Sequence, residues 1–328
     1  MRVTVLSGGV GGARFTRGLL ALLAERLPDG AGGTTAEVTV IANTGDDMWL
    51  HGVRVCPDLD TLMYTLGGAV HEGQGWGRRD ESSRVSADLA GYGLGWEWFT
   101  LGDLDLATHL ARTELLRAGL PLSRVTARLC ERWHPGVRLL PMTDAEVETH
   151  VELVDGSLVH FEEWWVRLHA AVPARRFVQQ GLADALPAPG VLDALAMADV
   201  VVLPPSNPVV SVGTILAIPG VRDAVRDAPA PVVGISPVIG GAPVRGMADA
   251  CLAAIGVETS AAAVARHYGR RADAGVLDAW LVDTVDAAAV PTLLADGWTA
   301  TAAPTLMSDV AATAAIAAAA LTLVDRLP

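Results

Sequence analysis

Runs of apolar residues along the chain predict strands, and several of them are followed by helical patterns. The first run ends at Leu6, a glycine-rich segment over residues 7–12 follows, and apolar residues recur at helical spacing from Phe15. Further continuous apolar runs occupy residues 38–42, 199–203 and 232–236. Uninterrupted runs of this kind are typical of parallel strands covered on both faces. We therefore predict an α/β fold with a doubly wound, mostly parallel, Rossmann-like sheet.

The middle of the chain has a different pattern and predicts an inserted lobe. Apolar residues at helical spacing follow His109, a strand is expected at 137–141, and charged and apolar positions alternate over 148–153. The dipeptide Asp155-Gly156 predicts a hairpin turn that leads into residues 158–161. We expect a mainly helical lobe with a small antiparallel piece.

These patterns suggest a division of the chain into two units. Residues 1–75 and 178–328 are expected to form the nucleotide-binding α/β core. Residues 76–177 are expected to form the inserted lobe, which would cover one side of the site.

The glycine-rich segment is the first candidate for a phosphate site. Its glycines are Gly8, Gly9, Gly11 and Gly12. Glycine has no Cβ atom, so the backbone can approach a ligand closely, and the following helix N-terminus offers free N–H groups to a phosphate. The spacing is only a fragment of the dinucleotide fingerprint, and the Lys-Ser/Thr end of a P-loop is missing. A plain glycine-rich turn between strand and helix therefore stays open.

Four aspartates follow the second predicted strand in two close pairs. They are Asp46, Asp47, Asp58 and Asp60. Open α/β sheets bind ligands at the carboxyl ends of their strands, so we expect these carboxylates in loops beside the glycine segment. Mg²⁺ takes oxygen ligands and is typically shared between one or two carboxylates and a substrate's phosphates. We therefore predict a Mg²⁺ site, while capping of the following helix stays open, for Asp58 more than for Asp60.

Two later loops would bring further polar groups to the same edge of the sheet. Ser206, Asn207 and Gly213 follow the strand at 199–203, and suit phosphate or nucleobase contacts. Arg245 follows the strand at 232–236 and suits a phosphate or a carboxylate, although solvation at the surface explains it equally well.

The composition narrows the classes of function. A formal net charge of -13 argues against a nucleic-acid partner, which needs clustered Lys and Arg. Cys56, Cys130 and Cys251 lie far apart without zinc-ligand spacing, which favours a reduced, cytoplasmic environment. We expect no signal peptide and no membrane span, because the N-terminus lacks the apolar core of a leader and residues 310–324 are too short to cross a bilayer. The 51% apolar composition makes a homodimer plausible.

Ten short motifs, spread over nearly the whole chain, identify a family. Seven of them are Ser7-Gly-Gly-Val-Gly11, Asn43-Thr-Gly-Asp-Asp47, Pro57-Asp-Leu-Asp60, Leu101-Gly-Asp103, Leu140-Pro-Met-Thr-Asp144, Ser206-Asn-Pro-Val-Val-Ser-Val-Gly213 and Ser236-Pro-Val-Ile-Gly-Gly241. The other three are Gly75-Trp-Gly-Arg-Arg-Asp80, Glu163-Trp-Trp165 and Arg245-Gly-Met-Ala-Asp-Ala-Cys251. Together they resemble the 2-phospho-L-lactate transferase family, and most of all its actinobacterial phosphoenolpyruvate transferase branch in coenzyme F420 biosynthesis.

The resemblance implies a Mg²⁺-dependent transferase. Members of the family move a phosphoenolpyruvyl or 2-phospholactyl group from a guanosine-diphosphate-linked donor to the ribityl hydroxyl of the deazaflavin Fo, and they release GMP. Such chemistry needs positioning and charge neutralisation more than a covalent catalyst. The sequence leaves open which of the two groups is transferred, because they differ only in the saturation of a three-carbon unit.

The resemblance also suggests roles for individual residues. Gly8, Gly9, Gly11 and Gly12 would hold the donor's phosphates, and Ser206, Asn207 and Gly213 would hold its guanosine end or β-phosphate. Asp47 and Asp60 would bind Mg²⁺, with Asp46 and Asp58 in second place, and one carboxylate would orient or deprotonate the Fo hydroxyl. Trp76, Arg78, Gly102 and Asp103 would line the deazaflavin side.

One departure and two competing functions stay open. Relatives often have arginine where this chain has Leu104, so acceptor or phosphate binding is weakened there unless another arginine, such as Arg78, substitutes. A sister group with the same glycine segment contains non-catalytic regulators that bind nucleotides or nucleotide sugars, but it lacks the motif at residues 76–80. A Rossmann dehydrogenase is disfavoured by the incomplete fingerprint and the four aspartates.

Overall fold

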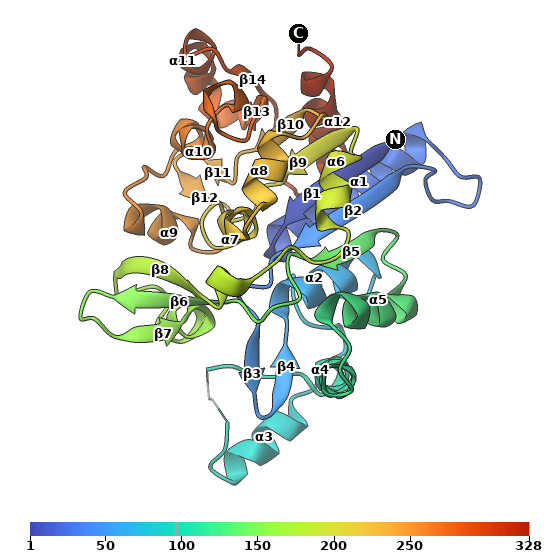
Figure 1. The fold of residues 1–328 in the computed structure, drawn as a ribbon, viewed down its shortest axis with the longest axis vertical. Helices are drawn as coiled ribbons and strands as arrows, with labels where there is room; N and C mark the ends of the chain where they lie inside the picture. Colours follow the sequence, from blue (N-terminus) through green and yellow to red (C-terminus); the bar gives the residue numbers. More distant parts are fainter. Residues whose placement is uncertain (96–97, 328) are drawn as a thin grey trace.

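A central sheet of seven strands organises the molecule, of which the computed structural model describes residues 1–95 and 98–327 (Figure 1). The strand order is β14-β13-β10-β9-β1-β2-β5, and all neighbouring pairs are parallel. The strands are β1 (Arg2–Ser7), β2 (Glu37–Ala42), β5 (Arg138–Pro141), β9 (Val200–Leu203), β10 (Val232–Ile235), β13 (Ala279–Val282) and β14 (Thr299–Ala302). The order reverses between β1 and β9, where ligands are expected at the carboxyl ends of the strands.

Helices cover both faces of this sheet, because alternate residues of each strand point to opposite sides. Val3 and Val5 of β1 pack under one layer, and Leu6 packs under the other. The first layer contains α1 (Gly9–Arg26), α2 (Pro57–Leu66), α5 (Leu122–Trp133) and α12 (Val310–Val324). The second contains α6 (Val191–Ala196), α7 (Val212–Ala217), α8 (Val221–Arg226), α9 (Ala248–Ala254), α10 (Ala261–Tyr268) and α11 (Val290–Ala295). The predicted doubly wound fold is confirmed.

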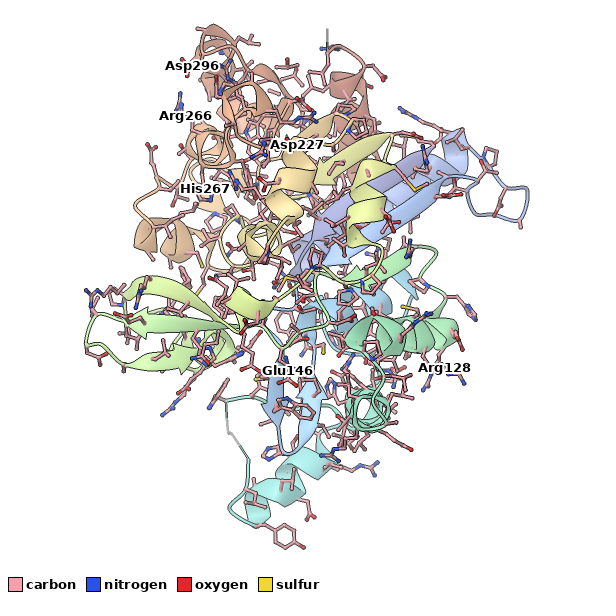
Figure 2. All side chains as sticks on the ribbon, in the orientation of Figure 1. Arg128, Glu146, Asp227, Arg266, His267 and Asp296 are labelled. Atoms are coloured by element: carbon pink, nitrogen blue, oxygen red, sulfur yellow. The ribbon has the colours of Figure 1, made fainter. Side chains whose placement is uncertain are left out.

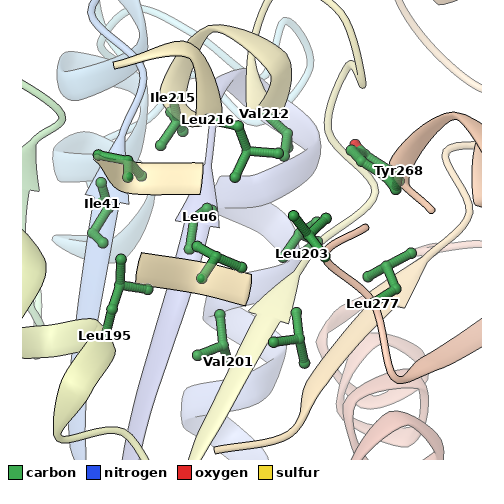
Figure 3. Packing of buried hydrophobic residues seen from close by; sticks show 14 of the residues in the cluster. Leu6, Ile41, Leu195, Val201, Leu203, Val212, Ile215, Leu216, Tyr268 and Leu277 are labelled. Carbon is green, nitrogen blue, oxygen red and sulfur yellow. The ribbon is translucent and has the colours of Figure 1, made fainter. Parts of the chain in front are cut away.

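Charged and apolar side chains separate as this layering requires. Exposed charges at the periphery include Arg128, Asp227, Arg266 and Asp296 (Figure 2). In the second layer, side chains of β1, β2 and β9 meet those of the covering helices (Figure 3). The strand residues are Leu6, Ile41, Val201 and Leu203, and their partners include Leu195, Val212, Ile215 and Leu216. A continuous apolar core therefore fixes the strand ends from which the site is built.

The predicted lobe contains the expected helices and antiparallel piece. The helices are α3 (Arg84–Gly91) and α4 (Asp103–Arg117), with the π-helical turn η1 (Glu163–Arg167). A small antiparallel sheet has the order β7-β6-β8, formed by β6 (Glu148–Leu153), β7 (Leu158–His160) and β8 (Ala174–Gln180). The hairpin expected around Asp155-Gly156 is thus confirmed.

Two features differ from the expected division of the chain. The strand expected at 137–141 within the lobe is β5, which joins the central sheet by pairing Leu140 with Ile41 of β2. A short apolar run is expected for a strand of the central sheet and for a strand of the lobe alike, so the pattern alone could not place this strand. In addition, the unanticipated hairpin β3 (Met48–Leu50) and β4 (Val53–Val55) packs against Leu101.

The elements not yet named are all short. They are β11 (Val238–Ile239), β12 (Ala242–Pro243), η2 (Leu182–Asp184), η3 (Arg271–Asp273) and η4 (Thr284–Ala289). Within the described part of the chain, no helix combines the length and the apolar character needed to cross a membrane.

Candidate functional site

A cavity of about 520 Å³ lies where the strand order reverses, at the carboxyl ends of the central strands. Segments that are far apart in the sequence contribute to its wall. The start of α1 contributes Gly8, Gly9, Gly11 and Arg14, and the first turn of α2 contributes Asp58. The loops after β2, β9 and β10 contribute Asp46, Ser206, Asn207, Ser211 and Ser236. Further residues of the wall include Trp76, Phe161, Trp165, Arg245 and Met247. The cavity is thus lined by polar and aromatic side chains together.

The glycine-rich segment belongs to the first helix rather than to a loop. Helix α1 begins at Gly9, directly after the extended residue Gly8, so most of the predicted loop is its first turn. The N-cap residue Gly8 has no side chain to cap this 18-residue helix, and the first turn contains no acidic residue. The backbone of Gly9 hydrogen-bonds to the carboxylate of Asp58. The following N–H groups of the first turn have no partner within the helix, and such groups suit an anion.

Glycine is required here because α1 starts in close contact with the loop after β9. A Cβ atom at Gly11 would lie 2.5 Å from the carbonyl oxygen of Pro205, and one at Gly8 would lie 2.5 Å from Cβ of Ser211. The Ser206 hydroxyl donates to the Gly8 carbonyl at 2.9 Å and ties the two segments together. Gly12 is buried behind this contact and does not line the cavity.

Two of the four predicted aspartates, Asp46 and Asp58, face the cavity. The amide nitrogen Nδ2 of Asn43 donates to both, at 3.2 Å to Asp46 and 2.9 Å to Asp58. Burial raises the pKa of Asp58 to about 6, although Asn43 opposes the shift. Burial and the charge of Asp58 also raise the pKa of Asp46, whose Oδ1 atom is buried without a hydrogen-bond partner.

This carboxylate pair suits a divalent cation. A hard cation would compensate the buried negative charge and would use the orphaned oxygen of Asp46. Asp58 lies in the first turn of α2 rather than in a loop, but the helix N-cap is Cys56 and no side chain caps the helix. Capping therefore does not explain Asp58.

The other two aspartates lie away from this wall. Asp60 forms an ion pair with the fully buried Arg112, and its Oδ2 lies 3.5 Å from Nδ1 of His109. Positions 58 and 60 of a helix point about 200° apart, so both cannot face one cavity. From the sequence, Asp47 and Asp60 were expected to be the main Mg²⁺ ligands. Their placement does not favour this expectation, and Asp46 and Asp58 are the better candidates.

The buried residues behind the cavity form a polar network of their own. Asp60, Asp105 and His109 each place a ligand atom within 4.8 Å of the others, which is close enough to share a metal ion. However, the guanidinium of Arg112 already supplies the opposite charge to Asp60. Burial raises the pKa of Asp47 to about 7, although the charges of Arg54 and Arg112 and a hydrogen bond with Cys56 oppose the shift. We infer that this network stabilises the fold and does not bind a ligand in the cavity.

The residues expected on the deazaflavin side are divided between two places. Trp76 lines the cavity, where the guanidinium carbon of Arg245 lies 5.9 Å from its ring centroid. Arg78, Gly102 and Asp103 are not part of this wall. Arg78 instead donates to the carbonyl of Leu104 at 2.8 Å, so its guanidinium reaches the first turn of α4, where the substitute arginine was expected.

The loop after β9 behaves partly as predicted. Ser206 and Asn207 line the cavity, and Oδ1 of Asn207 accepts from the backbone of Val209 at 2.9 Å. Gly213 lies inside α7, outside the wall, where a Cβ atom would lie 2.7 Å from the carbonyl oxygen of Pro208. Its role is therefore close packing, while Ser206, Asn207 and Ser211 of the preceding loop line the cavity.

Several residues of the wall were not singled out from the sequence. Arg14 follows Gly8 and Gly11 at helical spacing, so it could have been found had the helix start been placed at Gly9. Ser211 and Cys251 lie within two of the quoted motifs but had no role assigned to them, and no local pattern connects Phe161 to the glycine segment.

Comparisons with known proteins agree over nearly the whole chain. The family model of 2-phospho-L-lactate transferase CofD matches residues 3–313. A phosphoenolpyruvate transferase of Streptomyces coelicolor is 58% identical over 330 residues, which cover 100% of this chain and 99% of the relative. One of Thermobifida fusca is 60% identical over 290 residues, 88% of each chain.

The solved structures that resemble this chain are more distant in sequence. A crystal structure of a Bacillus halodurans member of the UPF0052 family has a TM-score of 0.62 at 19% identity and covers 98% of this chain and 99% of its own. At that identity the likeness shows a shared fold and nothing more.

Proposed function

This chain belongs to the 2-phospho-L-lactate transferase CofD family, a family of transferases in coenzyme F420 biosynthesis, and from that premise we propose its reaction in full. The enzyme moves a phosphoenolpyruvyl group from a guanosine-diphosphate-linked donor to the ribityl hydroxyl of the deazaflavin Fo and releases GMP. The choice of phosphoenolpyruvyl over 2-phospholactyl is supported by relatives named phosphoenolpyruvate transferase at 58–60% identity.

One observation carries the proposal: the N-terminus of α1 and the buried carboxylates of Asp46 and Asp58 face the same cavity. The N–H groups of α1 would bind the donor's diphosphate, and Ser206 and Asn207 would contact its guanosine end or β-phosphate. Asp46 and Asp58 would hold Mg²⁺, which, when bound, neutralises charge on the diphosphate.

The aromatic residues of the cavity suit a planar apolar acceptor. Trp76 and Trp165 are among its lining residues, and the rings of Phe161 and Trp165 lie 5.9 Å apart between centroids. The neighbouring Trp164 is fully buried and donates from Nε1 to the carbonyl of Val172 at 2.8 Å, so it belongs to the core. Stacking on the exposed rings would orient Fo with its ribityl chain toward the diphosphate.

The transfer requires positioning more than covalent catalysis. The ribityl oxygen forms a bond to the β-phosphorus of the donor, the bond from that phosphorus to the bridging oxygen breaks, and GMP leaves with the bridging oxygen. A carboxylate oxygen of Asp46 or Asp58 that does not ligate Mg²⁺ would accept the hydroxyl proton, directly or through water.

Mass spectrometry of the products tests this function. The protein is incubated with Fo, Mg²⁺ and a donor in which GDP carries either an enolpyruvyl or a lactyl group on its β-phosphate. We expect GMP and phosphoenolpyruvyl-Fo, with loss of both when Mg²⁺ is chelated. Nucleotide binding without any Fo-linked product would refute the proposal and favour a non-catalytic regulator.

Assembly and location stay predictions. We expect a cytoplasmic homodimer, for which sedimentation of the purified protein gives a direct test of the oligomeric state.

A further inference from the structure

Two arginines line the cavity without a carboxylate partner. Arg14 lies on α1 one turn after Gly11, and Arg245 lies in the loop between β12 and α9. Both side chains donate to backbone carbonyls, and within the described part of the chain neither forms an ion pair.

The segment that precedes Trp76 holds Arg245 in place. Nη1 of Arg245 donates to the carbonyl of Gln74 at 2.7 Å, and Nη2 donates to that of Gly73 at 3.1 Å. A Cβ atom at Gly75 would lie 2.6 Å from Nη1 of Arg245 and 2.7 Å from Cγ1 of Val10. The guanidinium is therefore confined beside the first turn of α1, close to the proposed diphosphate site.

Among the described residues, the positive charge of Arg14 has no carboxylate that pairs with it directly. Its Nη2 atom donates to the backbone carbonyl of Glu72 at 3.3 Å, but the carboxylate of Glu72 is engaged by Arg17 at 2.6 Å. Burial lowers the pKa of Arg14, and the neighbouring charges of Arg245 and Arg17 lower it further. Like charges brought together at a cavity wall repel one another unless an anion binds between them.

We propose that Arg14 and Arg245 bind the carboxylate of the three-carbon unit that is transferred, an inference that rests on the proposed function. The diphosphate already has the N–H groups of α1 and the Mg²⁺ site at Asp46 and Asp58. The group it carries adds one more anion, and a planar guanidinium matches a carboxylate with two parallel hydrogen bonds. Phosphoenolpyruvyl and 2-phospholactyl donors both carry this carboxylate, whereas GDP-sugars do not.

The pair would therefore act as a specificity device. It would select donors with an acidic three-carbon unit against other esters of GDP, and it would not distinguish the saturated from the unsaturated unit. Removing either arginine should cost affinity only for donors that carry the carboxylate.

Calorimetry with three ligands in Mg²⁺ buffer tests this assignment. The ligands are GDP, GDP with an ethyl ester on its β-phosphate, and GDP with a lactyl group joined there through the 2-hydroxyl. We expect the wild type to bind the lactyl ester about tenfold or more tightly than the ethyl ester, the scale of one charge-assisted hydrogen bond. Arg14→Gln and Arg245→Gln should each remove most of this preference and leave affinity for GDP within about threefold.

Two further variants sharpen the result. Arg14→Lys keeps the charge but loses the paired hydrogen bonds, so we expect it to keep part of the preference. Arg26→Gln removes an exposed arginine from the last turn of α1 and should behave as the wild type. The far-UV circular dichroism spectrum and the urea midpoint of each variant report whether it is folded.

Three outcomes would overturn the assignment. An equal loss for all three ligands would mean that the arginines bind the diphosphate, and an undiminished preference in both glutamine variants would mean that they do not contact the carboxylate. A wild type that forms the Fo product but shows no preference would refute the carboxylate site and leave the proposed function standing. If the wild type bound none of the ligands and made no product, the proposed function itself would fail.

Discussion

Replacing Gly11 by alanine tests whether the contact between α1 and the loop after β9 shapes the phosphate site. A Cβ atom at Gly11 would lie 2.5 Å from the carbonyl oxygen of Pro205, whereas real Cβ atoms essentially never come closer than 3.0 Å to such an atom. The helix and the loop must therefore separate by at least 0.5 Å. The clash is with backbone, and no flexible side chain can absorb it.

The magnitude follows from two opposing effects. Overpacking costs about 1–3 kcal/mol, and the higher helix propensity of alanine offsets up to about 1 kcal/mol of this cost, so we expect the free energy of unfolding to fall by about 0–3 kcal/mol. GDP affinity should suffer more clearly, because the displacement changes the direction of several N–H groups. Weakening one or two hydrogen bonds to a charged phosphate corresponds to a loss of about tenfold or more.

Urea unfolding and calorimetric titration with GDP and Mg²⁺ measure the two effects separately. Gly91→Ala is the matched control, because no atom lies within 4 Å of a Cβ atom at Gly91 in α3. We expect Gly91→Ala to bind GDP as the wild type does. If Gly11→Ala kept wild-type stability and bound GDP within about twofold of the wild type, our account of the glycine segment would be wrong.

Three further perturbations address the carboxylates and the buried charges. Asp58→Asn should lower Mg²⁺-dependent GDP affinity about tenfold or more by calorimetry, whereas the exposed Asp223→Asn should not; equal affinity in both variants would exclude Asp58 as a ligand. Arg112→Met should lower the free energy of unfolding in urea by about 3–5 kcal/mol, because the carboxylate of Asp60 is left buried and unpaired. Arg128→Met breaks an exposed pair with Glu131 and should cost at most about 1 kcal/mol, and similar small losses in both variants would contradict the argument. Burial alone would raise the pKa of Asp283, but hydrogen bonds from Val285 and Thr305 lower it. The contribution of Asp283 to the free energy of unfolding is therefore fully present above a pH of about 4, and it is lost as the pH falls through the lowered pKa of the folded state. Asp283→Asn should flatten the acid side of the curve of stability against pH, and an unchanged slope would count against this linkage.

The sequence predicted much of the site because the relevant patterns are local. A strand, a glycine segment and a helix lie next to one another, and the aspartates follow the neighbouring strand directly. Since the carboxyl ends of parallel strands share one edge of a sheet, these residues were expected to meet. Gly8, Gly9, Gly11, Asp46, Asp58, Ser206, Asn207, Trp76 and Arg245 do line one cavity.

Side-chain direction was beyond such reasoning. The sequence could not tell that Asp58 faces the cavity while Asp60 faces Arg112, because this depends on where α2 begins and how it packs. Arg78, Gly102 and Asp103 were grouped with Trp76, but the fold turns them toward the start of α4. The motifs give residue types and spacing, and they do not show in which direction the chain runs after Trp76.

By itself, the sequence determined the family, the parallel sheet and the chemical groups available at the edge of that sheet. These features follow from the order of the motifs and from the hydrophobic period, both of which depend only on neighbouring residues in the chain. Only the tertiary structure decided which aspartates share Asn43, that β5 completes the central sheet, and that Arg14 and Arg245 lie on one wall although they are 231 positions apart. The physical reason is that burial and charge pairing depend on contacts between distant segments, and those contacts exist only once the chain has packed.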